Sequence, residues 1–221
     1  MKELTEEYLA LTGDVLIASG LMAYLGPFTS LYRNKQIKDW VEKLKEKGIP
    51  CSSSPLLSET LGNQVKIRQW IIDGLPTDTF SIDNAIIVFN ARRWPLMIDP
   101  QLQGIAWVRN KEGGEDRNLA IVRLGQKDLL RKLERALENG HTILIENIGE
   151  SIDAVLYPVI QRATIKRGRT FYVKLGDSEV EMNPNFKLYL HTKLSNPHYP
   201  PEIQAETTLV NFTVTMAGLE D

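Results

Sequence analysis

The chain has 221 residues, of which 43% are hydrophobic and 24% are charged, and its formal net charge is −2 at pH 7. This composition is ordinary for a globular protein with a buried core, and the small net charge excludes a global basic field that would attract nucleic acid or an acidic membrane. The single cysteine, Cys51, excludes an internal disulfide and a cysteine-based zinc site.

The sequence shows no sign of a membrane segment or a leader. No apolar run approaches the roughly 20 residues that a bilayer-spanning helix needs, and residues 1–7 lack a signal-peptide pattern. We therefore expect a soluble protein of the cytoplasm or cytoskeleton that binds neither membrane nor nucleic acid. Its length fits one large domain, or one domain with an appendage.

The N-terminal part of the chain is predicted to be helical. Apolar residues recur at helical spacing over residues 3–48, and Gly26 and Pro27 interrupt the pattern. A second helix is expected from about residue 29 to residue 47, with Gly48 as its C-cap and Pro50 beyond it. The serine-rich residues 51–55 form the best internal boundary. The sequence thus predicts a helical segment over residues 1–50 and a main domain over residues 56–221.

Strand and helix patterns alternate through the main domain. Apolar runs predict strands at residues 95–98, 119–124, 142–146, 186–192 and 208–215, and helices at 105–110, 128–138 and 152–161. Residues 81–89 fit either a short helix or a strand. Gly176 and Asp177 predict the turn of a hairpin between residues 171–175 and 178–182. Repeated strand–helix units with apolar strands predict an α/β fold whose mostly parallel sheet is covered on both faces.

The turn after residues 95–98 is the first candidate site. A strand, a tight turn and a helix start are the setting of the Walker A loop, G-x-x-x-x-G-K-[ST]. Over residues 99–106 only the second glycine, Gly104, is kept; Asp99 replaces the first glycine, Ile105 the lysine and Ala106 the hydroxyl residue. Ile and Ala cannot hold phosphate or Mg²⁺, and Asp99 would repel phosphate. The candidate nucleotide-contacting residues are Asp99, Pro100, Gln101, Gly104, Ile105 and Ala106.

The end of the strand at residues 142–146 is the second candidate site. In a P-loop ATPase this strand ends in Asp-Glu, where the first acid holds Mg²⁺ indirectly and the second polarises the attacking water. Here the pair is Glu146-Asn147. Glu146 either binds a metal or merely caps a buried strand, and Asn147 cannot act as a carboxylate base. Because both motifs are degenerate, we expect no catalytic residue, no metal site and no cofactor, with ATP or ADP as the remaining candidate ligands.

The other ionisable and aromatic residues predict no further site. His141, His191 and His198 lack metal-binding spacing and are interpreted as turn or strand-end residues. The basic run over residues 162–169 is interpreted as a solvated helix end and turn. The four tryptophans are interpreted as packing anchors of the core.

Nearly the whole chain resembles a known family. The motifs, in chain order, are GDVL at 13–16, YLGPF at 24–28, GLPTD at 74–78, SIDN at 81–84, RWPLMIDPQ at 93–101, IENIGE at 145–150, KLSNPHY at 193–199 and LVNFTVT at 209–215. They resemble the fifth AAA+ module of dynein heavy chains. Residues 92–101 and 196–199 are more similar to axonemal, ciliary chains than to cytoplasmic ones.

This resemblance implies an AAA+ large subdomain, a P-loop-NTPase-like sheet flanked by helices, within a motor ring. Residues 1–48 would be the returning base of the microtubule-binding stalk and its junction with the module. In that family the first module hydrolyses ATP to drive the stroke, whereas the fifth does not bind nucleotide productively. Glu206 stands where an arginine finger is expected, which argues against catalysis in a neighbouring module.

We therefore hypothesise a non-hydrolysing structural module of a microtubule motor that relays motion between ring and stalk. Its partners would be the neighbouring AAA+ modules of the same chain, the stalk coiled coil and, through the full motor, the microtubule of the cilium axoneme. Two alternatives remain open. One is a regulatory module that holds ATP or ADP through backbone amides at residues 103–106, and the other is a plain α/β binding module with its own partner.

Overall fold

The computed structural model describes residues 2–114 and 118–213, with side chains from residue 8 onward. The chain divides into two compact units, Met1–Asn90 and Ala91–Thr213, each of which is described by itself. The sequence-based division at residues 50–56 stays a prediction, because the two units group residues by spatial contact rather than by their role in a longer chain.

The first unit is helical, which the sequence predicted for its part up to residue 50. Its elements are α1 (Lys2–Gly20), a π-helical turn η1 (Leu21–Leu25), α2 (Ser30–Glu46), α3 (Leu57–Thr60), α4 (Gln64–Ile72) and α5 (Thr79–Asn90). Gly48 follows α2 with a φ of 67°, in the left-handed conformation that glycine favours after a helix. Residues 81–89, which the sequence left open, belong to helix α5. Four of its consecutive apolar side chains, residues 85–88, are buried, and such a run fits a buried helix as well as a strand.

One buried arginine joins three helical elements of this unit. The Arg33 side chain is 2% exposed. Its Nε donates to the carbonyl oxygens of Leu25 and Phe28, and its Nη2 donates to the carbonyl oxygen of Gly26 and to Oδ1 of Asn84. Arg33 of α2 therefore caps the carbonyl end of η1 and fastens it to α5.

A helical stretch in this unit corrects one expectation from the sequence. Tyr8–Leu25 is 18 residues long, has a mean hydropathy of 1.5 and is 28% buried, so by length and composition it is able to cross a membrane. The sequence interpretation looked for an uninterrupted apolar run, whereas mean hydropathy averages over the small and polar residues between the apolar ones. Mostly buried core helices of soluble proteins and signal sequences near an N-terminus meet the same criterion.

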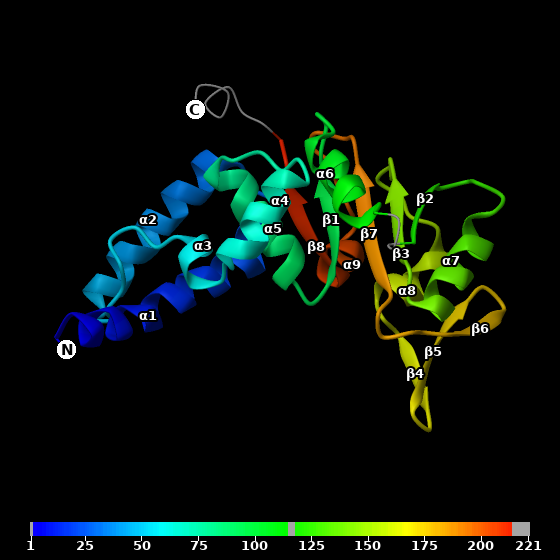
Figure 1. The fold of residues 1–221 in the computed structure, drawn as a ribbon, viewed down its shortest axis with the longest axis horizontal. Coiled ribbons are helices and arrows are strands. Elements are labelled where there is room, and N and C mark those ends of the chain that lie inside the picture. Colours follow the sequence, from blue (N-terminus) through cyan, green and yellow to red (C-terminus); the bar gives the residue numbers. More distant parts are fainter. Residues whose placement is uncertain (1, 115–117, 214–221) are drawn as a thin grey trace. The chain divides into compact units, whose positions relative to one another are not determined.

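The second unit is built on a five-stranded, parallel sheet (Figure 1). Its strands are β1 (Trp94–Ile98), β2 (Leu119–Arg123), β3 (Thr142–Glu146), β7 (Lys187–Thr192) and β8 (Thr207–Asn211), in the spatial order β2-β3-β7-β1-β8. The helices of this unit are α6 (Gln103–Glu112), α7 (Leu129–Asn139), the short η2 (Ala154–Leu156), α8 (Tyr157–Ile160) and α9 (Pro201–Glu206). The predicted α/β class is confirmed, and residues 214–215 of the last predicted strand lie outside the described residues.

The core of the second unit lies on the three interior strands of the sheet, β3, β7 and β1, and on the helices that cover them. Every residue of β1 and β3 is buried, as expected for strands covered on both faces. Leu133 and Leu137 of α7 are fully buried in the same cluster as Leu96, Ile143 and Leu190. α7 ends at Gly140, whose φ of 70° suits a helix C-cap. The apolar stripe of α7, formed by Leu129, Leu133, Ala136 and Leu137, is therefore the side that packs on the sheet.

A second, small antiparallel sheet was predicted only in part. The expected hairpin is present as β5 (Thr170–Leu175) and β6 (Ser178–Glu181), but β4 (Thr164–Arg167) pairs with β5 as a third strand. The interpretation of residues 162–169 as a helix end and turn was therefore wrong for β4. All four β4 side chains are exposed, so the strand has no alternation between buried and exposed residues that the sequence could display.

Candidate functional site

The carboxyl ends of the parallel strands bring the two candidate motifs to one edge of the sheet. β1 pairs with β7 and β7 pairs with β3, and all three run in the same direction. Asp99 follows β1, Glu146 ends β3 and His191 lies near the end of β7. Ligands of open α/β sheets bind outside these strand ends, so this edge is the place to examine.

The loop after β1 closes around the carboxylate of Asp99. The Asp99 side chain is fully buried; its Oδ1 accepts a hydrogen bond from the Gln103 backbone nitrogen at 3.0 Å and its Oδ2 accepts one from the Ile105 nitrogen at 2.8 Å. Leu102, at the N-cap of α6, has a φ of 64°, which turns the chain sharply into the helix. The first amides of α6 thus converge on an anion that the chain itself supplies.

Two opposing influences act on this carboxyl group. Burial raises the pKa of Asp99 above its ordinary value, and the hydrogen bonds from the backbone amides of residues 102–105 lower it. Burial is the larger influence. The amides therefore offset only part of the cost of removing the charge from water.

The remaining residues of this loop lie in different surroundings. Ile105 is buried in the core, whereas Gln101 and Ala106 are exposed and Pro100 is half-buried. Gly104 is buried against Phe212: a Cβ atom at Gly104 would lie 2.9 Å from the Phe212 ring. The glycine is thus required by the packing of α6 on the residue after β8.

The second motif is held by an arginine from α6. Glu146 is 5% exposed, and its Oε1 accepts a hydrogen bond from Nη2 of Arg109. The Nε of Arg123, on β2, lies 3.5 Å from Oε2 of the same carboxylate. Two guanidinium groups of the chain itself therefore face the carboxylate that ends β3. Among the described residues, no group of three or more His, Cys, Asp or Glu side chains is arranged to hold a metal ion.

His191 lies between the two motifs. Its side chain is fully buried, and its Nδ1 accepts a hydrogen bond from the Asn147 backbone nitrogen at 3.3 Å. Asn147 has a φ of 54°, in the left-handed region. Since Nδ1 is the acceptor, the neutral ring carries its proton on Nε2. This Nε2 lies 3.8 Å from Oδ2 of Asp99 and has no hydrogen-bond partner among the described residues. Burial lowers the pKa of His191 to about 4, against the attraction of the Glu146 carboxylate. The ring is therefore neutral near pH 7.

Sequence reasoning found Asp99, Glu146 and Asn147 in this cluster and missed Arg109, Arg123 and His191. The first three fall in motifs, whereas the other three carry no motif. The histidine was interpreted as a strand-end residue, and its position does lie near the end of β7. A usable signal was the convergence of parallel strand ends, which places the last residues of β3 and β7 next to the loop after β1.

The fold and the strand-end edge place the protein in a structural class. It is a mostly parallel α/β domain of the AAA+ type, with a turn that resembles a phosphate-binding loop after its first strand. The chain belongs to the ATP-binding dynein motor region family, whose sequence profile matches residues 68–221. Membership in this family confirms the dynein resemblance seen in the sequence.

Individual relatives agree with the family match. The chain is 52% identical over 224 residues to the dynein alpha chain of the flagellar outer arm of Chlamydomonas reinhardtii and 47% identical over 220 residues to the axonemal dynein heavy chain 3 of Homo sapiens. It is 50% identical over 214 residues to the ciliary dynein beta chain of Tripneustes gratilla. The alignments cover 100%, 100% and 96% of this chain and 5% of each relative. By name, these relatives are a flagellar, an axonemal and a ciliary dynein chain.

Proposed function

We propose that this chain is the fifth AAA+ module of an axonemal dynein heavy chain and that it works without binding or hydrolysing nucleotide. Its location would be the cytoskeleton of the cilium or flagellum, the setting that the names of its relatives indicate. ATP hydrolysis would take place in other modules of the full motor.

The observation that carries this proposal is the occupation of the strand-end edge by the chain's own charged groups. The Asp99 carboxylate binds the amides that would otherwise receive a phosphate, and the Arg109 guanidinium binds the Glu146 carboxylate that would otherwise face a cation. A nucleotide with Mg²⁺ would have to break both sets of contacts. It would also find Ile105 and Ala106 where lysine and a hydroxyl residue normally bind it.

The relay of motion to a stalk is supported by α1. Tyr8, Leu11 and Val15 recur at the alternating spacing of a coiled-coil seam, and their side chains are 72%, 45% and 42% exposed. An exposed apolar seam on a helix is suited to a second helix. In the full motor the stalk coiled coil would supply it, and a displacement of the stalk would reach this module through α1.

Titration calorimetry tests the nucleotide part of the proposal. ATP and ADP, each with Mg²⁺, are titrated into this chain, and we expect no binding heat and no rise in unfolding temperature at millimolar nucleotide. Micromolar binding would overturn the proposal. In the full heavy chain, Glu146→Gln is expected to leave ATPase activity unchanged, whereas a large loss of activity would mean that this module hydrolyses ATP.

The geometry of the amides also favours a second candidate, a nucleotide-holding regulatory module. The backbone nitrogens of Gln103 and Ile105 already converge on an anion, so a phosphate that displaced Asp99 would find the same donors. The two candidates differ in the titration above. Under the second, ADP binds the wild-type chain and Asp99→Gly tightens that binding.

A further inference from the structure

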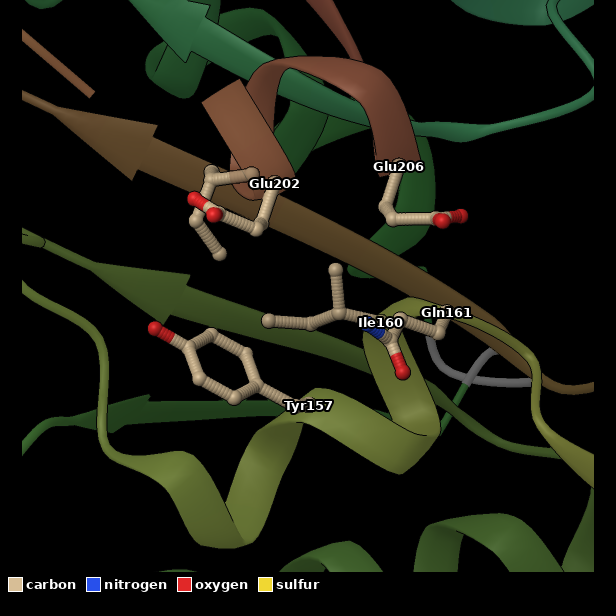
Figure 2. A pocket seen from close by; sticks show the side chains of 6 residues that line it. Tyr157, Ile160, Gln161, Glu202 and Glu206 are labelled. Carbon is tan, nitrogen blue, oxygen red and sulfur yellow. The ribbon is translucent and has the colours of Figure 1, made fainter. Parts of the chain in front are cut away.

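A pocket lies between α8 and α9, within the second unit. Its volume is about 160 Å³. Tyr157, Ile160 and Gln161 line it from the α8 side, and Glu202, Ile203 and Glu206 line it from α9; Figure 2 shows the labelled side chains of these two groups facing each other across the gap. Cavities of about 150 Å³ hold a benzene-sized group, whereas most ligand sites start at roughly 300 Å³. The pocket therefore fits one large side chain and not a nucleotide.

This pocket is separate from the cluster at the carboxyl ends of the strands. Glu206 directly precedes β8, whose first residue pairs with Trp94 at the start of β1. The Trp94 Nε1 donates to the Val159 carbonyl oxygen in α8 at 2.9 Å. Both walls of the pocket are thus tied to the amino ends of the strands, the opposite edge of the sheet.

The lining of the pocket is complementary to a long cationic side chain. Ile160 and Ile203 are buried and give it an apolar floor, and Tyr157 adds an aromatic ring. Glu202 and Glu206 lie one helical turn apart on the rim, and among the described residues neither carboxylate has an ion-pair or hydrogen-bond partner. An apolar floor suits the methylene stem of such a side chain, and the two carboxylates suit its charge.

Arginine fits these features better than lysine. Its planar guanidinium offers a fork of N–H donors that matches a carboxylate in two-point geometry, and it stacks on an aromatic ring. The ammonium group of lysine is compact and strongly hydrated, so it gains less from Tyr157 and loses more water on entry. The pocket offers both a ring and two carboxylates.

We propose that the pocket receives one arginine side chain from another segment of the same, longer polypeptide. This inference rests on the proposed function, in which the chain is one module of a heavy chain. The relatives are far longer than this chain, which spans 5% of each, so most of such a polypeptide lies outside it and is available as the donor. The roles are the reverse of those in an arginine finger. This module supplies the two carboxylates, and the other segment of the polypeptide supplies the arginine.

Site-directed photo-crosslinking in the purified full-length heavy chain tests the proposal. A photoreactive phenylalanine analogue replaces Gln161, an exposed residue on the pocket rim, and the cross-linked peptide is identified by mass spectrometry. We expect a single intramolecular cross-link, next to an arginine outside this chain. The same analogue at Glu138, exposed on α7, should not capture that peptide.

Charge-neutralised variants give the second measurement. Glu202→Gln with Glu206→Gln should lower the cross-link yield roughly two- to thirtyfold, the range for two partly exposed ion pairs. The matched control is Glu134→Gln with Glu138→Gln, a pair on α7 with the same spacing and similar exposure, which should leave the yield unchanged. Replacing the captured arginine by lysine should lower the yield less than replacing it by alanine.

Three outcomes would overturn the proposal: no cross-link in the assembled chain, a cross-linked peptide without an arginine, or a yield that the double glutamine variant does not change. A peptide from a different polypeptide would also overturn it. These outcomes are independent of the nucleotide titration, which tests the other edge of the sheet. A failure here therefore leaves the proposed absence of nucleotide binding untouched.

Discussion

A single carboxylate, that of Asp99, decides the chemistry of the loop after β1. From the sequence it was an obstacle to phosphate; in the structure it also satisfies the amides of Gln103 and Ile105. Buried backbone N–H groups without a partner are costly, so a loop that gives up phosphate needs another acceptor for them. Asp99 fulfils that need from within the chain.

Replacing this acceptor should therefore destabilise the second unit. Asp99→Asn keeps one acceptor oxygen but turns an NH₂ group toward a backbone N–H, so we expect the free energy of unfolding to fall by about 2–3 kcal/mol. Urea denaturation measures the change. Asp153→Asn is the matched control, because Asp153 also accepts from a backbone amide, that of Val155, but at an exposed site. Equal effects at the two sites would contradict this role for Asp99.

Gly104 makes a separate prediction about packing. Gly104→Ala places a methyl group 2.9 Å from the Phe212 ring, and overpacking of this kind costs about 1–3 kcal/mol of stability. Phe212→Leu should recover part of the loss in the double variant, measured as coupling in a double-mutant cycle. Additive effects would show that the glycine is kept for another reason.

Asp83, in the first unit, makes a prediction about pH. Burial raises the pKa of Asp83 from 3.8 to about 7; Asp78 adds to the rise and Arg33 opposes it. The folded state thus holds this proton more tightly than the unfolded state. The stabilisation that comes from this bound proton is complete below about pH 4 and is lost as the pH rises through 7.

The Asp83→Asn variant removes this titration. Relative to wild type, it should therefore gain stability progressively between pH 4 and pH 8, as measured by thermal unfolding at a series of pH values. The exposed Glu46→Gln serves as the control and should show no such trend. A constant difference between Asp83→Asn and wild type across this pH range would refute the argument.

At the scale of elements, Arg33 holds the junction of η1, α2 and α5. Arg33→Lys keeps the charge but cannot reach all four acceptors, so we expect a loss of about 2–4 kcal/mol, because buried acceptors are left unpaired. Hydrogen exchange should accelerate at the amides of η1 and the start of α2. Arg68→Lys, the same change at an exposed site on α4, should have little effect. Similar exchange in both variants would contradict this role.

Most elements could be predicted because their patterns are strong. The apolar stripe of α7 and the apolar strands β1 and β3 define themselves by periodicity and length. α5 could not be settled, because a run of buried apolar residues is common to helices and strands. β4 was missed because its exposed side chains carry no burial pattern, although it pairs with β5 across the short turn at Gly168 and Arg169.

The candidate site was predicted as two isolated motifs rather than as one cluster. Asp99 and Glu146 were visible because each falls in a pattern of fixed spacing. The pairing of Arg109 with Glu146 joins residues 37 positions apart, and no local pattern encodes it. The Asn147–His191 contact depends in the same way on the order of strands in the sheet, which periodicity does not give.

At the scale of the whole molecule, the two units predict where the chain can be divided. All five strands of the large sheet lie within Ala91–Thr213, so residues 91–213 should fold alone and unfold cooperatively. Amide NMR spectra of residues 91–213 and of the full chain test this prediction. The signals of the second unit should have the same chemical shifts in both. If residues 91–213 aggregate while residues 56–213 fold, the boundary predicted from the sequence is the better one.

The contact between Asp99 and the α6 amides also bears on how the molecule responds to metabolism. A ligand that binds only the folded state stabilises it by an amount that depends on its concentration. A tethered carboxylate has a fixed effective concentration that the surrounding adenine nucleotide pool does not change. The strand-end edge should therefore keep the same geometry in an energy-rich and an energy-depleted cell. Under the proposed function, this region would keep its geometry while other modules of the motor respond to ATP.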